Sequence, residues 1–465
     1  MTLVPVSFLL PIVAGALLFA LPRGSSASER TSSDVLARTI GTLVAVATFA
    51  MLLAMREAQW SVRWLSRPFT AAFHFGATPV SFWIALLLTI CTACAIATTR
   101  VHRARDFVAL MLMLEGTMLG LFLARDLLVF ALFWDLMLVP VFFGLIGWGE
   151  HPATAWRYFI YNFAGGLTLL LATAAFGVIY GSTDVIGRSG AHLVGAWAPW
   201  IYAGFAFAFL VKTPVWTLHT WMPPTYSGLP PPMVAVVSAV QSKAGLYGFL
   251  AIALALVPDY VREYAGPLMV LGAISLIYGA VIALVQNDAK RLVAYSSLSH
   301  LGLIVVAIAS GNRIALAGAL VYIVAHGLFS AALFMLLGYL EEREETRSLL
   351  RLGGLGWNNP RLAGALCIAV LAALGLPGLA GFVGELIILI GVYQAGYVWA
   401  VIVALVAIVI AAAYMIRLYQ DAMNGPEVAD VPVRADLTWV EGLAVAPLLA
   451  ALVIVGVYPG PLLRL

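Results

Sequence analysis

Residues 313–339 read RIALAGALVYIVAHGLFSAALFMLLGY, and this stretch decides the class of fold. After Arg313 it carries no full charge, and it exceeds the roughly 20 apolar residues that cross a hydrocarbon core about 30 Å thick. Comparable runs recur along the chain, which is 63% hydrophobic and 10% charged, with a mean hydropathy of +1.01. A soluble domain carries about 25% charged residues. The sequence therefore predicts an all-α integral membrane protein.

Working outward from this run, we predict about fourteen transmembrane helices in one continuous bundle. Their approximate ranges are 3–21, 35–55, 80–99, 106–124, 126–148, 155–181, 199–218, 231–257, 265–285, 290–310, 313–339, 361–393, 397–420 and 439–459. The first run lacks the basic segment and the cleavage site of a signal peptide, so we expect it to be retained as the first span.

Two predicted spans are interrupted. In the seventh, Lys212-Thr213-Pro214 and the Pro-rich segment 223–232 cannot continue a regular helix. In the twelfth, GLPGLAG at 375–381 lies inside a long apolar stretch. Broken backbone is tolerated at depth only where it is buried in protein or lines a wet cavity, and kinks that serve packing alone are the alternative. The breaks lie five spans apart, which is typical of two inverted five-helix repeats with discontinuous helices 7 and 12.

This pattern predicts four segments. They are N-terminal helices 1–3 in residues 1–105, a first repeat of helices 4–8 in 106–258, a second, inverted repeat of helices 9–13 in 259–420, and a C-terminal loop with helix 14 in 421–465. Basic residues gather in one set of alternate loops, as they do on cytoplasmic sides. The set includes Arg100, Arg103, Arg105, Lys290, Arg291, Arg343, Arg347, Arg351 and Arg361. With fourteen spans, both termini are expected on the non-cytoplasmic side.

Lysine and arginine are distributed differently in this chain. Only three lysines accompany 22 arginines, and two of the three, Lys212 and Lys243, lie inside predicted spans. Every arginine can be placed in a loop or near a span end. Lysine can lose its proton when it is removed from water, whereas arginine stays charged. A membrane site that loads and releases protons can therefore use lysine.

Seven ionisable residues are predicted near the middle of the membrane. They are Glu115, Asp135, Lys212, Lys243, His300, His326 and Glu385. The first six lie roughly 13 to 21 Å from the nearer helix end at 1.5 Å per residue, and the last follows the break in span 12. Each charge at the centre of a lone helix costs about 2.5 to 3.5 kcal/mol on insertion scales. Such a layer favours a proton pathway.

Structural roles are the alternatives for these residues. Asp135 and Lys212 as a static ion pair would hold spans 5 and 7 together, although ion pairs are poor packing material. Glu115 would be a protonated carboxyl that is hydrogen-bonded within the bundle. His300 and His326 would be core residues whose hydrogen bonds are all made. His219 stays unassigned. Cys91, Cys94 and Cys367 are interpreted as ordinary buried thiols, and the net charge of +3 does not indicate nucleic-acid binding.

Several motifs resemble a known family. They are FWDLMLVP (133–140), VKTP (211–214), LHTWMP (218–223), NDAKRLVAYSSLSH (287–300), AHG (325–327) followed by LEER (340–343), and GFVGE (381–385). Together they cover nearly the full chain and resemble the antiporter-like subunits of respiratory complex I, most of all subunit M of bacterial NADH-quinone oxidoreductase. Glu385 and the absence of a long lateral helix fit that subunit type.

The resemblance implies roles for single residues. Asp135 and Lys212 match the ion pair of helices 5 and 7, and Lys243 the central proton carrier. His300 and His326 match a hydrated relay, Glu385 the terminal group, and Glu115 a carboxylate of some M subunits. The family usually has glutamate at position 135, and the shorter aspartate reaches about 1.3 Å less, which predicts a weaker or water-bridged pair. The Pro-rich segment 223–232 also departs from the usual M pattern.

We therefore expect a proton-translocating subunit of an NADH-quinone oxidoreductase in the bacterial inner membrane. Its expected partners are L-like and N-like antiporter subunits and the lipid bilayer. NADH, flavin, iron–sulfur clusters and quinone are expected on other subunits, with no cofactor in this chain. A sodium/proton antiporter subunit of the Mrp type, a hydrogenase membrane subunit and a scaffold that has lost pumping remain alternatives.

Overall fold

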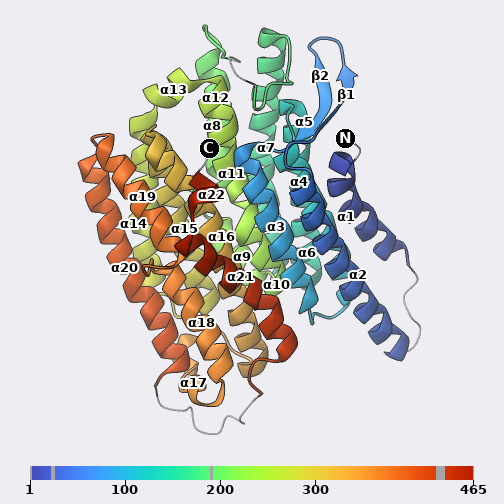
Figure 1. The fold of residues 1–465 in the computed structure, drawn as a ribbon, viewed down its shortest axis with the longest axis vertical. Coiled ribbons are helices and arrows are strands. Elements are labelled where there is room, and N and C mark those ends of the chain that lie inside the picture. The colour runs from blue at the N-terminus through green and yellow to red at the C-terminus, as the bar shows by residue number, and fades with distance from the viewer. Residues whose placement is uncertain (1–2, 22–26, 189–191, 426–434, 464–465) are drawn as a thin grey trace. The chain divides into compact units, whose positions relative to one another are not determined.

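The computed structural model describes residues 3–21, 27–188, 192–425 and 435–463 and shows a predominantly helical protein (Figure 1). Twelve helices of the described residues are long and apolar enough to cross a membrane. Three shorter apolar helices accompany them, α8 (Ala198–Lys212), α18 (Pro360–Ala373) and α19 (Ala380–Gln394). The predicted helical membrane bundle is thus confirmed, while the count of fourteen and the inverted repeats stay predictions. Residues 426–434 of the predicted C-terminal loop lie outside the described part.

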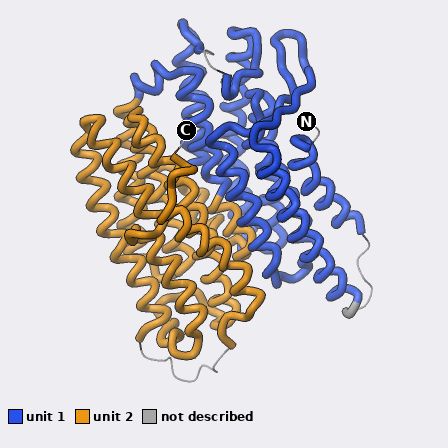
Figure 2. The backbone as a smooth tube through the Cα atoms, viewed as in Figure 1, with its two compact units in different colours: residues 1–213, 240–264 blue, residues 214–239, 265–465 orange. Residues whose placement is uncertain are grey.

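The chain forms two compact units (Figure 2). Unit 1 comprises residues 1–213 and 240–264, and unit 2 comprises residues 214–239 and 265–465. One boundary falls inside the π-helix η1 (Val237–Gln241). The chain therefore passes from unit 1 to unit 2 and back before it completes unit 2, an exchange that hydropathy alone did not indicate.

Unit 1 consists of helices and one small sheet. Its remaining elements are α1 (Leu3–Ala20), α2 (Ala27–Ala54), β1 (Gln59–Leu65), β2 (Ala71–Gly76), α3 (Pro79–Ala97), α4 (Ala104–Leu123), α5 (Leu127–Leu136), α6 (Leu138–Trp148), α7 (Pro152–Tyr180), α11 (Lys243–Gly248), the π-helix η2 (Phe249–Ala253), α12 (Leu254–Leu256) and α13 (Pro258–Glu263). Within the unit, α4 packs against α1, α2, α3 and α5, and α7 against α5, α6 and α8.

Among the described residues of unit 2, all the regular secondary-structure elements are helices. Its remaining elements are α9 (Met222–Gly228), α10 (Pro231–Val236), α14 (Ala265–Leu284), α15 (Ala289–Ala309), α16 (Arg313–Glu344), the 3-10 helix η3 (Leu349–Arg351), α17 (Leu355–Asn358), α20 (Val398–Met423), α21 (Trp439–Val457) and α22 (Gly460–Leu463). Helix α16 packs against α10, α15, α18, α19 and α21 and is buried along its whole apolar window. The stretch that decides the fold class is thus the central helix of this unit.

The sheet of unit 1 was not predicted. Strands β1 and β2 pair in antiparallel register, with Gln59 opposite Gly76 and Arg63 opposite Ala72. The side chain of Asp126 caps α5 and also accepts a hydrogen bond of 2.9 Å from the backbone N–H of Ala72. A search for apolar runs overlooks the hairpin because most of β1 is exposed and its residues alternate in polarity. The hairpin is a local addition to a fold that is otherwise helical, as predicted.

Both predicted helix interruptions are present. Helix α8 ends at Lys212, and the next helix, α9, begins only at Met222. In the second interruption α18 ends at Ala373 and α19 begins at Ala380. The linker there contains Gly375 with φ +78° and Gly378 with φ +95°, which glycine adopts without the steric cost that a Cβ imposes.

Candidate functional site

The predicted ionisable residues are divided between the two units. We call the four residues of unit 1 (Glu115, Asp135, Lys212 and Lys243) the lysine cluster and the three of unit 2 (His300, His326 and Glu385) the histidine cluster. All are buried except Asp135, which is half-buried. Burial removes the water that would otherwise stabilise these charges. Each cluster therefore needs local partners for its charges.

Lys212 ends α8 and faces residues of α5. Its side chain is 0% exposed, and its Nζ lies 5.0 Å from the ring centroid of Trp134. An ammonium at this distance from an indole ring gains cation–π stabilisation. The Nζ makes no hydrogen bond with the described part of the chain. Trp134 therefore stabilises the charge of Lys212 but does not accept a hydrogen bond from its Nζ.

Asp135 follows Trp134, the residue whose ring contacts Lys212, on α5. Within the described residues neither Oδ1 of Asp135 nor Nζ of Lys212 has a hydrogen-bond partner. On the neighbouring α7, a Cβ added to Gly166 would overlap with the Asp135 carboxylate. The absence of a side chain at Gly166 therefore leaves the space that this carboxylate occupies.

Lys243 begins α11, and only Ser242 separates it from the π-helix η1. It is 0% exposed, and its Nζ lies 3.4 Å from the Oγ of Ser242. Helix α11 packs against α3 and against α8, the helix that carries Lys212. Short π-helical segments are rare and occur often at functional sites. The second π segment, η2, begins at Phe249, directly after the end of α11 at Gly248. This span therefore departs from a regular α-helix on both sides of α11.

Glu115 lies in the middle of α4 and meets α2. It is 0% exposed, and its Oε1 lies 2.6 Å from the hydroxyl of Thr48. Its Oε2 has no hydrogen-bond partner among the described residues. The Thr48 hydroxyl also lies 2.8 Å from the carbonyl oxygen of Ala45. A hydroxyl has a single proton, so it can donate to only one of these two oxygens at a time.

The histidine cluster contains a continuous hydrogen-bonded path. The Tyr322 hydroxyl on α16 lies 2.5 Å from Nδ1 of His300 on α15 and donates to Oε1 of Glu385 on α19 at 2.7 Å. Since the hydroxyl donates to Glu385, it accepts from the N–H of His300 in the matching tautomer. Residues of three helices thus form one hydrogen-bonded path, from an imidazole through a phenol to a carboxyl.

His326 lies next to this path. It is 0% exposed on α16, and its ring centroid lies 5.7 Å from that of His300. Phe329 contacts both imidazole rings, at 5.1 Å from His326 and 5.3 Å from His300. The cluster therefore combines two adjacent imidazoles with an apolar wall.

Glu385 lies in the second turn of α19, just after the interruption. It is 5% exposed, and a Cβ added to Gly375 would overlap with its carboxyl group. Nearby on α15 and α20, the Tyr414 hydroxyl donates to the Oγ of Ser296 at 3.0 Å. The interrupted helix thus brings backbone, rather than side chain, against the carboxyl.

Two further features of the prediction have a plain structural place. His219 belongs to unit 2, where its ring centroid lies 5.2 Å from that of Tyr278. Within the described residues of unit 2, no hydrogen bond or ring contact joins it to His300, His326 or Glu385. Cys91 and Cys94 are buried, and Cys367 is half-buried. In the described residues no group of three or more His, Cys, Asp or Glu side chains is arranged to hold a metal ion.

Sequence reasoning missed three residues that touch the predicted site. They are Thr48 against Glu115, Trp134 against Lys212 and Tyr322 between His300 and Glu385. A signal existed only for Tyr322, which precedes His326 by four residues on one helix and so shares its face. Thr48 lies on a different helix, and no local pattern indicates its contact.

Comparisons with known proteins agree with this architecture. A family model described as "NADH:quinone oxidoreductase/Mrp antiporter, TM" matches residues 124–411. The chain is 30% identical to NADH-quinone oxidoreductase subunit M of Rhodobacter capsulatus over 97% of this chain and 92% of the relative. A chain of respiratory complex I from Thermus thermophilus is 31% identical, with a TM-score of 0.88 over 99% of this chain and 97% of that one. A chain of the Mrp complex from Dietzia sp. DQ12-45-1b has a TM-score of 0.86 over 100% of this chain and 96% of that one, and its 20% identity shows a shared fold alone.

Proposed function

Because this chain belongs to the NADH:quinone oxidoreductase/Mrp antiporter family of transmembrane subunits, we propose that it moves protons through its two buried clusters. It is an antiporter-like membrane subunit of the complex I type. The observation that carries the proposal is the complete burial of Lys212 and Lys243, side chains that can be charged or neutral, in a protein with only three lysines.

In the lysine cluster the proposed step is electrostatic. When Asp135 moves close to Lys212, the two charges compensate and Lys243 can hold a proton. When they separate, the uncompensated ammonium repels the proton on Lys243 and drives it onward. Within the described residues Nζ of Lys212 and Oδ1 of Asp135 make no hydrogen bond, which supports a pair that can both open and close.

In the histidine cluster the proposed step is transfer along hydrogen bonds. A proton that reaches His326 or His300 passes through the Tyr322 hydroxyl to Glu385, since Tyr322 lies within hydrogen-bond distance of both His300 and Glu385. The hydroxyl accepts one proton as it gives up another, so it changes orientation and not charge. Glu385 is the proposed terminal group. Glu115, next to Thr48, is proposed as a further carboxyl of the pathway.

The proposal assigns the chain a place in a larger complex. Relatives of this chain are membrane subunits of NADH-quinone oxidoreductase, so we propose L-like and N-like subunits as neighbours and the bacterial inner membrane as the location, with both termini non-cytoplasmic. NADH, flavin, iron–sulfur clusters and quinone would lie on other subunits. This chain would contribute proton movement to the translocase without a redox step of its own.

The test is replacement of Lys243 by alanine in the whole complex. Inverted membrane vesicles report acidification with a pH-sensitive dye, and NADH oxidation with an artificial electron acceptor reports the amount of complex. We expect acidification per complex to fall at least about tenfold, which equals about 1.4 kcal/mol on the limiting step. Lys290→Ala is the matched control, because Lys290 lies in the first turn of α15 and is paired with Glu341 at 2.5 Å. Unchanged acidification in Lys243→Ala would contradict the proposal and favour a scaffold.

The family description also includes Mrp antiporters. The second candidate function is therefore sodium/proton exchange as a subunit of the Mrp type. The same vesicles distinguish the two functions. With proton translocation, acidification driven by NADH is equal in sodium and in choline media. A sodium gradient that drives proton movement without NADH would instead indicate the antiporter.

A further inference from the structure

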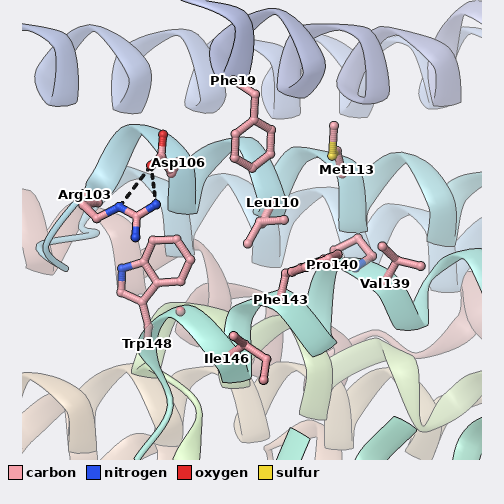
Figure 3. A pocket seen from close by; sticks show the side chains of 11 residues that line it. Phe19, Arg103, Asp106, Leu110, Met113, Val139, Pro140, Phe143, Ile146 and Trp148 are labelled. Carbon is pink, nitrogen blue, oxygen red and sulfur yellow. Dashed lines mark hydrogen bonds and ion pairs between the residues drawn. The ribbon is translucent and has the colours of Figure 1, made fainter. Parts of the chain in front are cut away.

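A groove opens on unit 1 between α1, α4 and α6 (Figure 3). Its volume is about 470 Å³. Its lining is apolar over most of its length and comprises Phe19, Leu110, Met113, Val139, Pro140, Phe143, Ile146 and Gly147. Phe143 and Ile146 are 51% and 44% exposed. The apolar floor of the groove is therefore exposed at the surface of the helix bundle.

One end of the groove is polar. Arg103, at the N-terminus of α4, lies with its guanidinium 5.4 Å from the ring centroid of Trp148, at the end of α6 (Figure 3). Helix α1 ends near the same level at Ala20, since Arg105 donates a hydrogen bond to the carbonyl oxygen of Leu21. Three spans end here together, and indole rings and arginines are enriched at the membrane–water interface. The polar end therefore lies at the headgroup level.

Arg103 retains positive charge at this end. Its Nε and Nη2 donate to Oδ2 of Asp106 at 3.1 and 2.8 Å. Arg105 donates to the other oxygen of the same carboxylate at 3.1 and 2.8 Å. Two guanidinium groups thus share one carboxylate, and the Asp34 carboxylate accepts a hydrogen bond from the backbone N–H of Arg105 at 2.9 Å. Arg103 presents its positive charge to the groove, because its side chain is 51% exposed while those of Arg105 and Asp106 are 7% and 3% exposed.

The length of the groove fits one leaflet. From Arg103 to Met113, the lining residues of α4 span ten positions, which is about 15 Å at 1.5 Å per residue. Half of a hydrocarbon core about 30 Å thick has the same length. An acyl chain that starts at the headgroup level would therefore lie along the whole floor.

We propose that this groove binds an anionic glycerophospholipid, with the headgroup phosphate against Arg103 and one acyl chain along the apolar floor. A soluble anion would use the polar end only and leave the floor without a role. A guanidinium forms charge-assisted hydrogen bonds with phosphate oxygens, and the exposed positive charge of Arg103 favours an anionic lipid over a zwitterion, whose headgroup adds a second positive charge. The basic loops predict that this end is cytoplasmic, and the cytoplasmic leaflet carries the anionic lipids.

The test uses the whole complex in nanodiscs of phosphatidylcholine with a trace of photoactivatable phosphatidylglycerol. Mass spectrometry measures adducts on the peptide that contains Phe143 and Ile146. Two variants remove one half of the site each. Gly147→Phe fills the groove, because nothing lies within 4 Å of a Cβ added there, and Arg103→Ala removes the charge. The matched controls are Gly364→Phe, at an equally open glycine of α18, and Arg100→Ala, in the same loop between α3 and α4 but outside the lining.

We expect adduct yield to fall about tenfold in both groove variants and to stay unchanged in both controls. A phosphatidylcholine probe should give about tenfold less adduct on the wild type, and inorganic phosphate should not compete. Equal yields from the two lipid probes, or unchanged yield in Gly147→Phe, would overturn the proposal. Adducts of the probe confined to another subunit would show that a protein neighbour covers the groove and would also overturn it.

Discussion

Replacing Tyr322 by phenylalanine removes one oxygen atom from the centre of the histidine cluster. The ring is retained, so the packing of α15, α16 and α19 is expected to persist. The hydroxyl lies 2.5 Å from His300 and 2.7 Å from Glu385. Without it, His300 and Glu385 are separated by roughly two hydrogen-bond lengths, a gap that only a water molecule can bridge.

The magnitude follows from the lost hydrogen bond to Glu385. A hydrogen bond to a charged group contributes about 1.5–3 kcal/mol. If about 2 kcal/mol is added to the barrier for proton transfer, the rate falls about 30-fold, since each 1.36 kcal/mol corresponds to tenfold. A water molecule in the vacated space would restore part of the rate, so we expect proton movement to fall by about tenfold to 30-fold.

The assay is NADH-driven acidification of inverted membrane vesicles, normalised to the amount of complex by NADH oxidation with an artificial acceptor. Tyr414→Phe is the matched control, because Tyr414 is also fully buried and its hydroxyl bonds Ser296 outside the path. The reasoning would be refuted if the two variants acidified the vesicles equally while both complexes assembled fully.

Three further predictions concern unit 1. Gly166→Ala places a Cβ against the carboxylate of Asp135, so we expect a loss of about 1–3 kcal/mol in stability and several-fold slower acidification. Thr48→Val removes the hydroxyl next to Glu115 and should lower the free energy of unfolding by about 1–2 kcal/mol in a detergent denaturation experiment. Asp126→Ala removes the cap of α5 and the bond to β2, and should cost about 2–3 kcal/mol without changing acidification per assembled complex.

Each of these predictions has a contrary result. Thr48→Ser keeps the hydroxyl and should behave as the wild type, so equal losses in serine and valine would point to packing as the cause. For Gly166, a loss of acidification that persists in the background of Asp135→Ala would show that the carboxylate is not involved. Reduced acidification per complex in Asp126→Ala would place the hairpin in the proton pathway.

Local sequence patterns decided the membrane character, most of the spans and both helix interruptions. Apolar runs report the length of a helix that can cross a bilayer. Several prolines close together remove the backbone N–H groups that a regular helix needs, whereas the single Pro11 and Pro447 lie inside α1 and α21. For the same reason the hairpin of β1 and β2 was missed, since its residues are neither apolar enough nor numerous enough to register. The burial of Lys212 and Lys243 also followed from their position within a span.

Contacts between distant segments were decided only by the tertiary structure. Tyr322 and Glu385 are 63 residues apart, and Thr48 and Glu115 are 67 residues apart. Whether two such side chains meet depends on how each helix is rotated about its axis, and in a membrane both faces of a helix can be apolar. Hydropathy therefore places a residue at a depth, while helix packing selects the neighbour that it touches at that depth.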